Sequence, residues 1–186
     1  ERSREEAYAV PGYEFCLACG LRNPRGVQVR FDYDDRVVWK RLVPQPHFGC
    51  ADGSLYPGYL CIGGDEIGWW LGALRQGECG LSNRVTVCLG APVAHGAPLL
   101  VLGARSPVTT SDPKGRVWQT QAAIVTLDWQ PVATVEVQFA GSRAFTKLML
   151  PGFVPGGNWA AIERVFPTAK AVREALDSGA LQAGDR

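Results

Sequence analysis

Two adjacent acids, Asp65 and Glu66, interrupt an otherwise apolar stretch and are the strongest candidates for chemistry in this chain. An unpaired buried carboxylate is energetically costly, so each acid must be paired, exposed or functional. We consider Asp65 a candidate catalytic carboxylate and Glu66 its reserve, because perturbed acids concentrate in active sites. The alternative is that neighbouring strands donate hydrogen bonds to Asp65 while Glu66 faces solvent.

The element that must position these acids is a long helix. Pro57 suits a first helical turn, no further proline occurs before Arg75, and Gly77 is a natural stop. Apolar residues surround the helix almost completely, which predicts a buried helix, although it is too short to span a membrane. These residues are Tyr59, Leu60, Cys61, Ile62, Ile67, Trp69, Trp70, Leu71 and Leu74.

Three glycines recur at every fourth position of this helix, namely Gly64, Gly68 and Gly72. Glycine inside a helix costs about 0.8–1 kcal/mol relative to alanine, so the three together cost about 2.5–3 kcal/mol. Packing must offset that cost, and the simplest source is the close approach of another backbone along the glycine stripe.

Four residues could form a metal site, because Cys16 and Cys19 make one chelating pair and His47 and Cys50 make a second. This spacing suits tetrahedral zinc in a closed structural site. The alternative is that no metal and no cofactor is bound. We expect Cys61 and Cys88 to be small core residues, since one lies in the buried helix and the other in a predicted strand.

The composition predicts a single globular domain with extensions. The chain has 186 residues, 46% of them apolar, and a net charge of +1, which points to neither nucleic acid nor a membrane as a partner. No secretory signal pattern is evident, so we expect a cytoplasmic protein with reduced thiols. We predict an arm over residues 1–14, a main domain over 15–145, and a linker with a helical extension over 146–186.

Alternating apolar residues predict a series of strands around the helix. The expected strands cover residues 27–31, 37–43, 85–89, 99–108, 116–129 and 132–140. Short turns between them favour antiparallel neighbours, so the fold class is α+β, with one antiparallel sheet curved around one long helix. After a linker over 151–157, Asn158 is a predicted N-cap, and a second helical piece follows from Pro167 to Leu176.

This order of elements resembles the hotdog fold, and more narrowly the PaaI-like and 4-hydroxybenzoyl-CoA-thioesterase-like acyl-CoA thioesterases. The resemblance covers about residues 15–140 and is carried by three places. They are Cys16-Leu-Ala-Cys-Gly-Leu-Arg-Asn-Pro-Arg-Gly26, His47-Phe-Gly49 before the helix, and the turn Pro92-Val-Ala-His-Gly96.

The resemblance implies hydrolysis of a small-molecule thioester at a site formed between subunits of a homodimer or homotetramer. The family's helix motif is His-Gly-Gly with an acid nine positions after the histidine, which aligns here with Tyr56-Pro57-Gly58 and Asp65. Pro57 has no N–H to donate to the thioester carbonyl. The Gly58 N–H would replace it, and the Tyr56 hydroxyl would replace the histidine. Tyr56 could equally be an ordinary hydrophobic contact at the helix start.

Three further residues are candidates for binding such a substrate. Trp69 lies one turn after Asp65 and could wall an acyl pocket, although large aromatics more often fill a core. His47 belongs to the lead-in motif, and Arg84 is a cation for coenzyme A phosphates. Two other functions stay open: acid–base chemistry on a non-thioester, as in a lyase, hydratase or isomerase, and binding of a small apolar ligand without catalysis.

Overall fold

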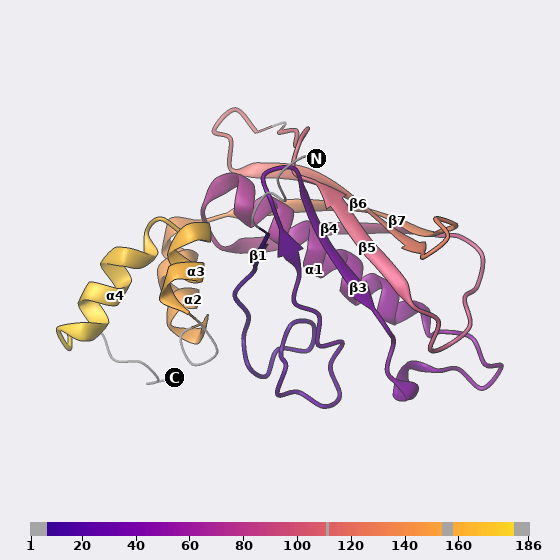
Figure 1. The fold of residues 1–186 in the computed structure, drawn as a ribbon. Helices are drawn as coiled ribbons and strands as arrows, with labels where there is room; N and C mark the ends of the chain where they lie inside the picture. The colour runs from indigo at the N-terminus through magenta and orange to yellow at the C-terminus, as the bar shows by residue number, and fades with distance from the viewer. Residues whose placement is uncertain (1–6, 111, 154–157, 181–186) are drawn as a thin grey trace, which may run out of the picture.

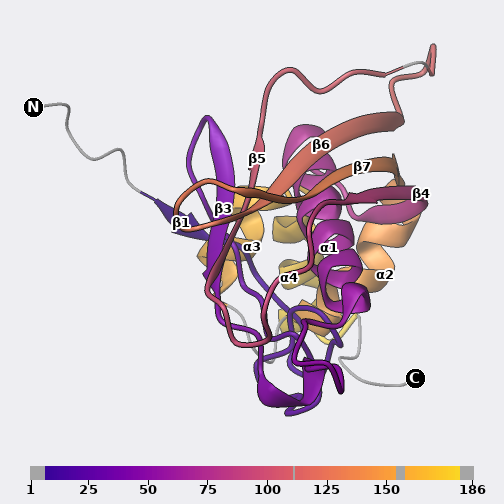
Figure 2. The same cartoon turned by 90° about the vertical axis from the view of Figure 1, so that its right-hand side faces the viewer.

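The computed structural model describes residues 7–110, 112–153 and 158–180. Within these residues, seven antiparallel strands form one sheet in the order β1-β2-β3-β5-β6-β7-β4. The sheet curves over one long helix, and the C-terminal helices lie together beyond one end of it (Figures 1 and 2). The strands are β1 Tyr8–Ala9, β2 Asp32–Tyr33, β3 Val37–Leu42, β4 Gly80–Leu89, β5 Leu99–Ala104, β6 Val117–Thr126 and β7 Pro131–Gly141. The helices are η1 Pro46–Phe48 (a 3₁₀ turn), α1 Pro57–Gln76, α2 Arg143–Phe153, α3 Trp159–Val165 and α4 Ala169–Asp177.

Helix α1 begins and ends where the sequence predicts. Tyr56 is its N-cap, Pro57 occupies the first turn, and Gly77 ends it in the left-handed conformation with φ 70°. No described helix combines the length and the apolar character that crossing a membrane requires. The predicted architecture, an antiparallel sheet around one buried helix, is therefore confirmed.

The glycine stripe of α1 packs against β7. A Cβ atom added to any of its three glycines would fall 2.2–2.6 Å from an inward-facing side chain of that strand. The pairs are Gly64 with Val135, Gly68 with Val137, and Gly72 with Phe139. The predicted close approach is real, but the neighbours of the glycines are β-branched and aromatic side chains rather than bare backbone. The Thr120 hydroxyl of β6 donates to the Gly68 carbonyl at 3.2 Å and ties the helix to the sheet.

The N-terminal part of the sheet differs from the prediction in two ways. Strand β1 lies inside the predicted arm and pairs with β2. Val27, Val29 and Phe31 are buried, but residues 27–31 are not a ladder strand, because the Val27 and Val29 amides bond the cysteine loop instead. The N–H groups of Val27 and Val29 donate to the carbonyls of Leu17 and Ala18 at 2.8 and 2.9 Å.

The C-terminal extension begins earlier than predicted and is more helical. Helix α2 crosses the expected boundary at residue 145 and includes Pro151, so the expected linker is wrong over 151–153, while 154–157 lie outside the described residues. Asn158 is confirmed as an N-cap, since its side chain accepts from the Ala160 N–H at 2.9 Å. The extension packs on α1, with the ring centroid of Trp70 6.1 Å from that of Phe153.

Two cysteines expected in the core are exposed instead. Cys61 lies on a part of α1 that the described residues leave uncovered, and Cys88 lies on the edge strand β4. All six cysteines, each within the described ranges, are free thiols.

The glycine packing generates a paired prediction. Gly68→Ala should lower the free energy of unfolding by up to about 2 kcal/mol, because overpacking against Val137 costs about 1–3 kcal/mol and the better helix propensity returns about 1 kcal/mol. Gly63→Ala, on the same helix, places its Cβ with nothing within 4 Å and should raise that energy by up to about 1 kcal/mol. Urea denaturation followed by circular dichroism measures both. Equal shifts in the two variants would contradict the packing account.

Candidate active site

The candidate acids lie on the wall of a cavity of about 190 Å³. Four segments of the chain meet there: the loop over residues 13–20, helix α1, helix α2 and the start of strand β4, which contributes Gly80 and Leu81. The loop contributes Tyr13, Cys16 and Cys19, α1 contributes Asp65, Glu66, Trp69 and Trp70, and α2 contributes Phe145, Met149 and Phe153. Its walls are mainly apolar, and its charged groups come from two adjacent residues of one helix. We call this space the Asp65 cavity.

Asp65 is the unpaired acid of the two. Its Oδ1 atom is buried and has no hydrogen-bond partner among the described residues. The alternative, in which neighbouring strands donate hydrogen bonds to this carboxylate, is therefore not observed at Oδ1. A buried carboxylate oxygen without a hydrogen-bond donor can accept a proton or bond a ligand. As long as it has neither, it lowers the stability of the folded protein.

Glu66 has a specific partner instead of solvent. The indole N–H of Trp70, one helical turn further on, donates to its Oε1 at 2.9 Å. Burial raises the pKa of Glu66 to about 7, and the nearby Cys16 thiolate acts in the same direction. The two neighbouring acids therefore differ in their hydrogen bonding: the Trp70 indole donates to Glu66, whereas Oδ1 of Asp65 has no donor.

The cysteine pair faces Glu66. One donor atom each from Cys16, Cys19 and Glu66 lie within 4.8 Å of one another. A hydrogen bond from Cys19 lowers the pKa of the Cys16 thiol, while that same bond and burial raise the pKa of Cys19. The Ala18 N–H also points at Cys16 Sγ, at 3.4 Å. These three residues are therefore the ones that could hold a metal.

The second predicted metal pair does not join this cluster. His47 is exposed, and its Nε2 lies 3.3 Å from the Arg25 carbonyl oxygen. Cys50 bonds within its own loop, where its N–H donates to the Ser54 carbonyl at 2.8 Å. The structure thus replaces the predicted four-residue zinc set by Cys16, Cys19 and Glu66.

The motif residues at the start of α1 form a separate group. The Tyr56 N–H donates to the Phe48 carbonyl and the Leu55 N–H to the Val93 carbonyl, each at 2.8 Å, so the lead-in and the turn over 92–96 meet at this end. The Tyr56 side chain is 54% exposed and its ring covers Gly58. Asp65 lies nine residues further along, or about 13 Å at the rise of an α-helix. A single chain does not bring Tyr56 and Gly58 to Asp65.

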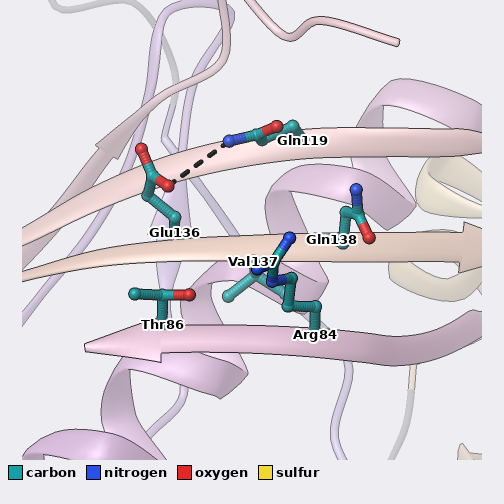
Figure 3. A pocket seen from close by; sticks show the side chains of 6 residues that line it. All are labelled: Arg84, Thr86, Gln119, Glu136, Val137 and Gln138. Atoms are coloured by element: carbon teal, nitrogen blue, oxygen red, sulfur yellow. Dashed lines mark hydrogen bonds between the residues drawn. The ribbon is translucent and has the colours of Figure 1, made fainter. Parts of the chain in front are cut away.

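Arg84 lies on the opposite face of the sheet from the Asp65 cavity. It lines a shallow hollow of about 260 Å³ with Thr86, Gln119, Glu136 and Gln138 (Figure 3). The Gln119 amide donates to the Glu136 carboxylate there at 3.4 Å. Within one chain Arg84 therefore does not meet Asp65, and its role as a cation for coenzyme A phosphates stays a prediction.

Trp69 is both a core residue and part of a cavity wall. Its indole N–H donates to the Gly80 carbonyl at 2.9 Å, and its ring stands edge-on to Phe139 with centroids 5.7 Å apart. Its remaining surface lines the Asp65 cavity. The residue is thus anchored in the core while it forms part of the wall.

The individual α2 residues that line the cavity are not among the predicted site residues. The Tyr13 hydroxyl donates to the Met149 carbonyl, and the Tyr13 ring lies 4.4 Å from that of Phe153, centroid to centroid. Phe145, Met149 and Phe153 recur at every fourth position, which is the signal of one helical face. That spacing was the available clue that this segment is a helix covering an apolar surface.

Comparison with known proteins identifies the architecture. A solved protein of the thioesterase superfamily matches with a TM-score of 0.56 and 21% identity, over 68% of this chain and 60% of that one. The match therefore spans less than two thirds of that protein. A hypothetical thioesterase from Streptococcus pneumoniae, solved with coenzyme A, matches with a TM-score of 0.50 and 14% identity, over 58% of this chain and 80% of that one.

The chain has the hotdog fold. Zebrafish thioesterase superfamily member 2 shares it, with a TM-score of 0.50 and 12% identity over 59% of this chain and 78% of that one. No family model matches the sequence, and no curated protein does. The likeness is therefore one of hotdog architecture, as the motifs of the sequence predict.

The opposite states of the two acids predict opposite effects on stability. Asp65→Ala should raise the free energy of unfolding by about 1 kcal/mol, because it removes an unsatisfied oxygen and improves helix propensity. Glu66→Ala should lower it by about 1–3 kcal/mol, because it leaves the Trp70 N–H without its acceptor. Chemical denaturation of both variants beside wild type measures the difference. Destabilisation by Asp65→Ala would show that the carboxylate has a stabilising role.

Proposed function

We propose that this protein hydrolyses an acyl thioester of the acyl-CoA type, with Asp65 as the carboxylate that acts on the thioester. The observation that carries this proposal is the buried, unpartnered Oδ1 of Asp65 in an apolar-walled cavity of a hotdog fold. A core carboxylate kept for stability would have donors. One kept for chemistry needs an acceptor that no donor occupies, and Oδ1 of Asp65 meets that requirement.

The chemistry requires a carboxylate and an oxyanion donor. In one route Asp65 accepts a proton from water as that water attacks the thioester carbonyl; the C–S bond then breaks, and the proton passes to the departing thiolate. In the other, Asp65 attacks the carbonyl itself and the thiolate leaves, and water then opens the resulting anhydride to give the acid and the free carboxylate, its proton passing to the thiolate. The N-terminus of α1 supplies the donor, because the first N–H groups of a helix lack intrahelical partners and carry partial positive charge. Pro57 offers none, so the donors are the Gly58 N–H and the Tyr56 hydroxyl.

These two parts must come from two chains. Tyr56 and Asp65 are about 13 Å apart along one helix, too far to act on one carbonyl. A homodimer that places the α1 N-terminus of one protomer beside the Asp65 cavity of its partner completes the site. Two such dimers can associate as a homotetramer.

Strand β4 is the surface that fits such a dimer. It is ten residues long and forms an edge of the sheet. The side chains of Val85 and Leu89 stand opposite the inward-facing Val137 and Ala133, yet remain 40% and 51% exposed. A long, apolar, unpaired edge is a template for another strand, and a second copy of the same edge pairs with it about a two-fold axis.

The cavity walls indicate where an acyl group would lie. Trp69, Phe145 and Met149 form an apolar surface beside Asp65, and a second hollow continues past Cys16 to Phe15 and Gly152. The acyl group occupies the cavity and the rest of the substrate runs outward along that hollow. Coenzyme A is the proposed carrier, and it is the ligand named for the Streptococcus pneumoniae hotdog protein.

One observation favours a second candidate function. Pro57 removes the N–H that the family uses at the oxyanion, while two acids, Asp65 and Glu66, share one cavity. Two carboxyl groups in different environments suit proton transfer on a non-thioester small molecule, as in a lyase, hydratase or isomerase. Binding of an apolar ligand without catalysis would leave both acids without a role.

The activity prediction is loss of turnover in Asp65→Asn. With a panel of acyl-CoA substrates and detection of the released thiol, we expect kcat to fall at least about 100-fold, because the amide cannot accept the proton. Asp35→Asn is the matched control, since that side chain is 70% exposed in a turn far along the chain. Full activity in Asp65→Asn would remove Asp65 from the mechanism. Absence of turnover by wild type on every member would favour the second function.

The dimer prediction is tested on the two faces of one strand. Val85→Lys combined with Leu89→Lys should convert the protein to monomers, because charges on the inward, apolar face of an exposed edge strand oppose its pairing with a second copy. Thr86→Lys, which stands opposite the outward-facing Glu136, should leave the oligomer intact. Light scattering after size-exclusion chromatography gives the mass. A monomeric wild type, or a double variant that remains dimeric, would rule out this interface.

A further inference from the structure

The loop over residues 13–20 and helix α1 bring two thiols and a carboxylate to one point. The Sγ atoms of Cys16 and Cys19 and a carboxylate oxygen of Glu66 all lie within 4.8 Å of one another. Glu66 is separated from Cys19 by more than forty positions, so only the fold creates this cluster. Cys19 is 4% exposed and Cys16 is partly exposed, and both line the Asp65 cavity.

Two of the three proposed ligand side chains, those of Cys16 and Glu66, are held by a group outside the cluster. The Ala18 N–H bonds Cys16 Sγ at 3.4 Å, and the Gly20 N–H bonds the Cys16 carbonyl at 3.1 Å, which closes the turn. A side chain at Gly20 would not fit, because its Cβ would lie 2.4 Å from the Cys16 nitrogen. The Trp70 N–H fixes Glu66. Such outer contacts are what orient the ligands of a metal site.

The charge around the cluster is one-sided. Among the described residues that line the cavity, two are carboxylic acids, two are cysteines and none is basic. Two arginines, Arg22 and Arg30, line a neighbouring hollow together with Cys19 and are engaged elsewhere. Arg22 pairs with Glu14 at 3.0 Å, and Arg30 donates to the Val10 carbonyl at 3.3 Å. A divalent cation would balance the thiolates and Glu66 where the protein supplies no positive charge.

We propose that Cys16, Cys19 and Glu66 bind one Zn²⁺ ion, with the fourth coordination position open to the Asp65 cavity. Two thiolates with one carboxylate select zinc over calcium and magnesium, which prefer oxygen ligands alone. Three protein ligands are the number found where a zinc site keeps an exchangeable position, whereas a structural site has four. Asp65 lines the same cavity but is not one of the proposed ligands.

The geometry needs little change to accept the ion. Zinc–ligand bonds of about 2.0–2.3 Å separate tetrahedral ligand atoms by roughly 3.3–3.8 Å. The observed limit of 4.8 Å therefore leaves at most about 1.5 Å of movement for any pair. Side-chain rotation supplies that movement when the metal replaces the protons shared by the three groups.

The test uses the full chain, stripped of metal with a chelator and kept reduced. Competition with a chromophoric chelator should show one Zn²⁺ per chain, and Co²⁺ in its place should give sulfur-to-cobalt charge-transfer bands. Cys16→Ser and Glu66→Gln should each weaken binding by at least the ~10–100-fold that outer-contact changes cost. Cys61→Ser and Cys88→Ser, which alter exposed thiols outside the cluster, should leave the affinity unchanged.

Three results would overturn the proposal: no charge-transfer band with cobalt, equal affinity in Glu66→Gln and wild type, or a Cys16–Cys19 disulfide in place of a bound metal. If Cys16→Ser does not fold by circular dichroism, the cobalt spectrum of wild type and the Glu66→Gln affinity still decide. The site stands apart from the proposed hydrolysis. Asp65→Asn should lose turnover yet bind zinc as wild type does, so the two proposals fail separately.

Discussion

The close packing of the α1 glycine stripe on β7 fixes the rotation of the helix, and the rest of the structure depends on that rotation. Gly64, Gly68 and Gly72 face Val135, Val137 and Phe139, with no room for a Cβ between them. Each following residue lies about 100° further around the helix. Asp65 and Trp69 therefore turn toward the start of β4, where the Trp69 indole bonds the Gly80 carbonyl. Glu66 and Trp70 turn further, toward the cysteine loop and the C-terminal helices. One stripe thus assigns the two adjacent acids to two different surroundings.

The Asp65 cavity, which both acids line, is built from segments far apart in the sequence. The cysteine loop is held by the amides of Val27 and Val29, which would otherwise pair in the sheet. Helix α2 is joined to that loop by the Tyr13 hydroxyl and by the Tyr13–Phe153 contact. The extension outside the resemblance is consequently part of the site, because the cavity has no wall on that side without it.

The sequence predicts what local patterns control. The span of α1, its end at Gly77, the later strands and the Asn158 cap all follow from periodicity, proline and glycine positions and capping chemistry. Residues 27–31 alternate like a strand but do not pair, because a loop occupies their amides, and no alternation pattern contains that information. Arg84 lies on the outer face because β4 bulges between Ser82 and Arg84, which resets the alternation there.

The site was predictable in its residues but not in its partners. Asp65, Glu66 and Trp69 were marked by their positions in an apolar helix, and all three line the cavity. The cysteine pair was marked by its spacing, but short sequence distance pointed to His47 and Cys50 as companions. Glu66 is the companion because the rotation of α1 aims it there, and rotation is set by contacts with β7 that a one-dimensional pattern does not encode.

Several residues at the Asp65 cavity depart from the usual preferences of helices and of buried polar groups. Packing or hydrogen bonding explains all but one of these departures. The helix glycines are required by β7, Pro57 suits a first turn, and Glu66 is satisfied by an indole. Among the described residues that line the cavity, only Asp65 has a buried side-chain oxygen without a hydrogen-bond partner, although such atoms occur elsewhere in the described chain, for example at Tyr33 and Gln45. A sequence selected only for stability would place an apolar residue or a paired side chain at that position. Natural proteins keep such a cost where function requires it, so the unpartnered Asp65 oxygen supports the proposed role of this cavity.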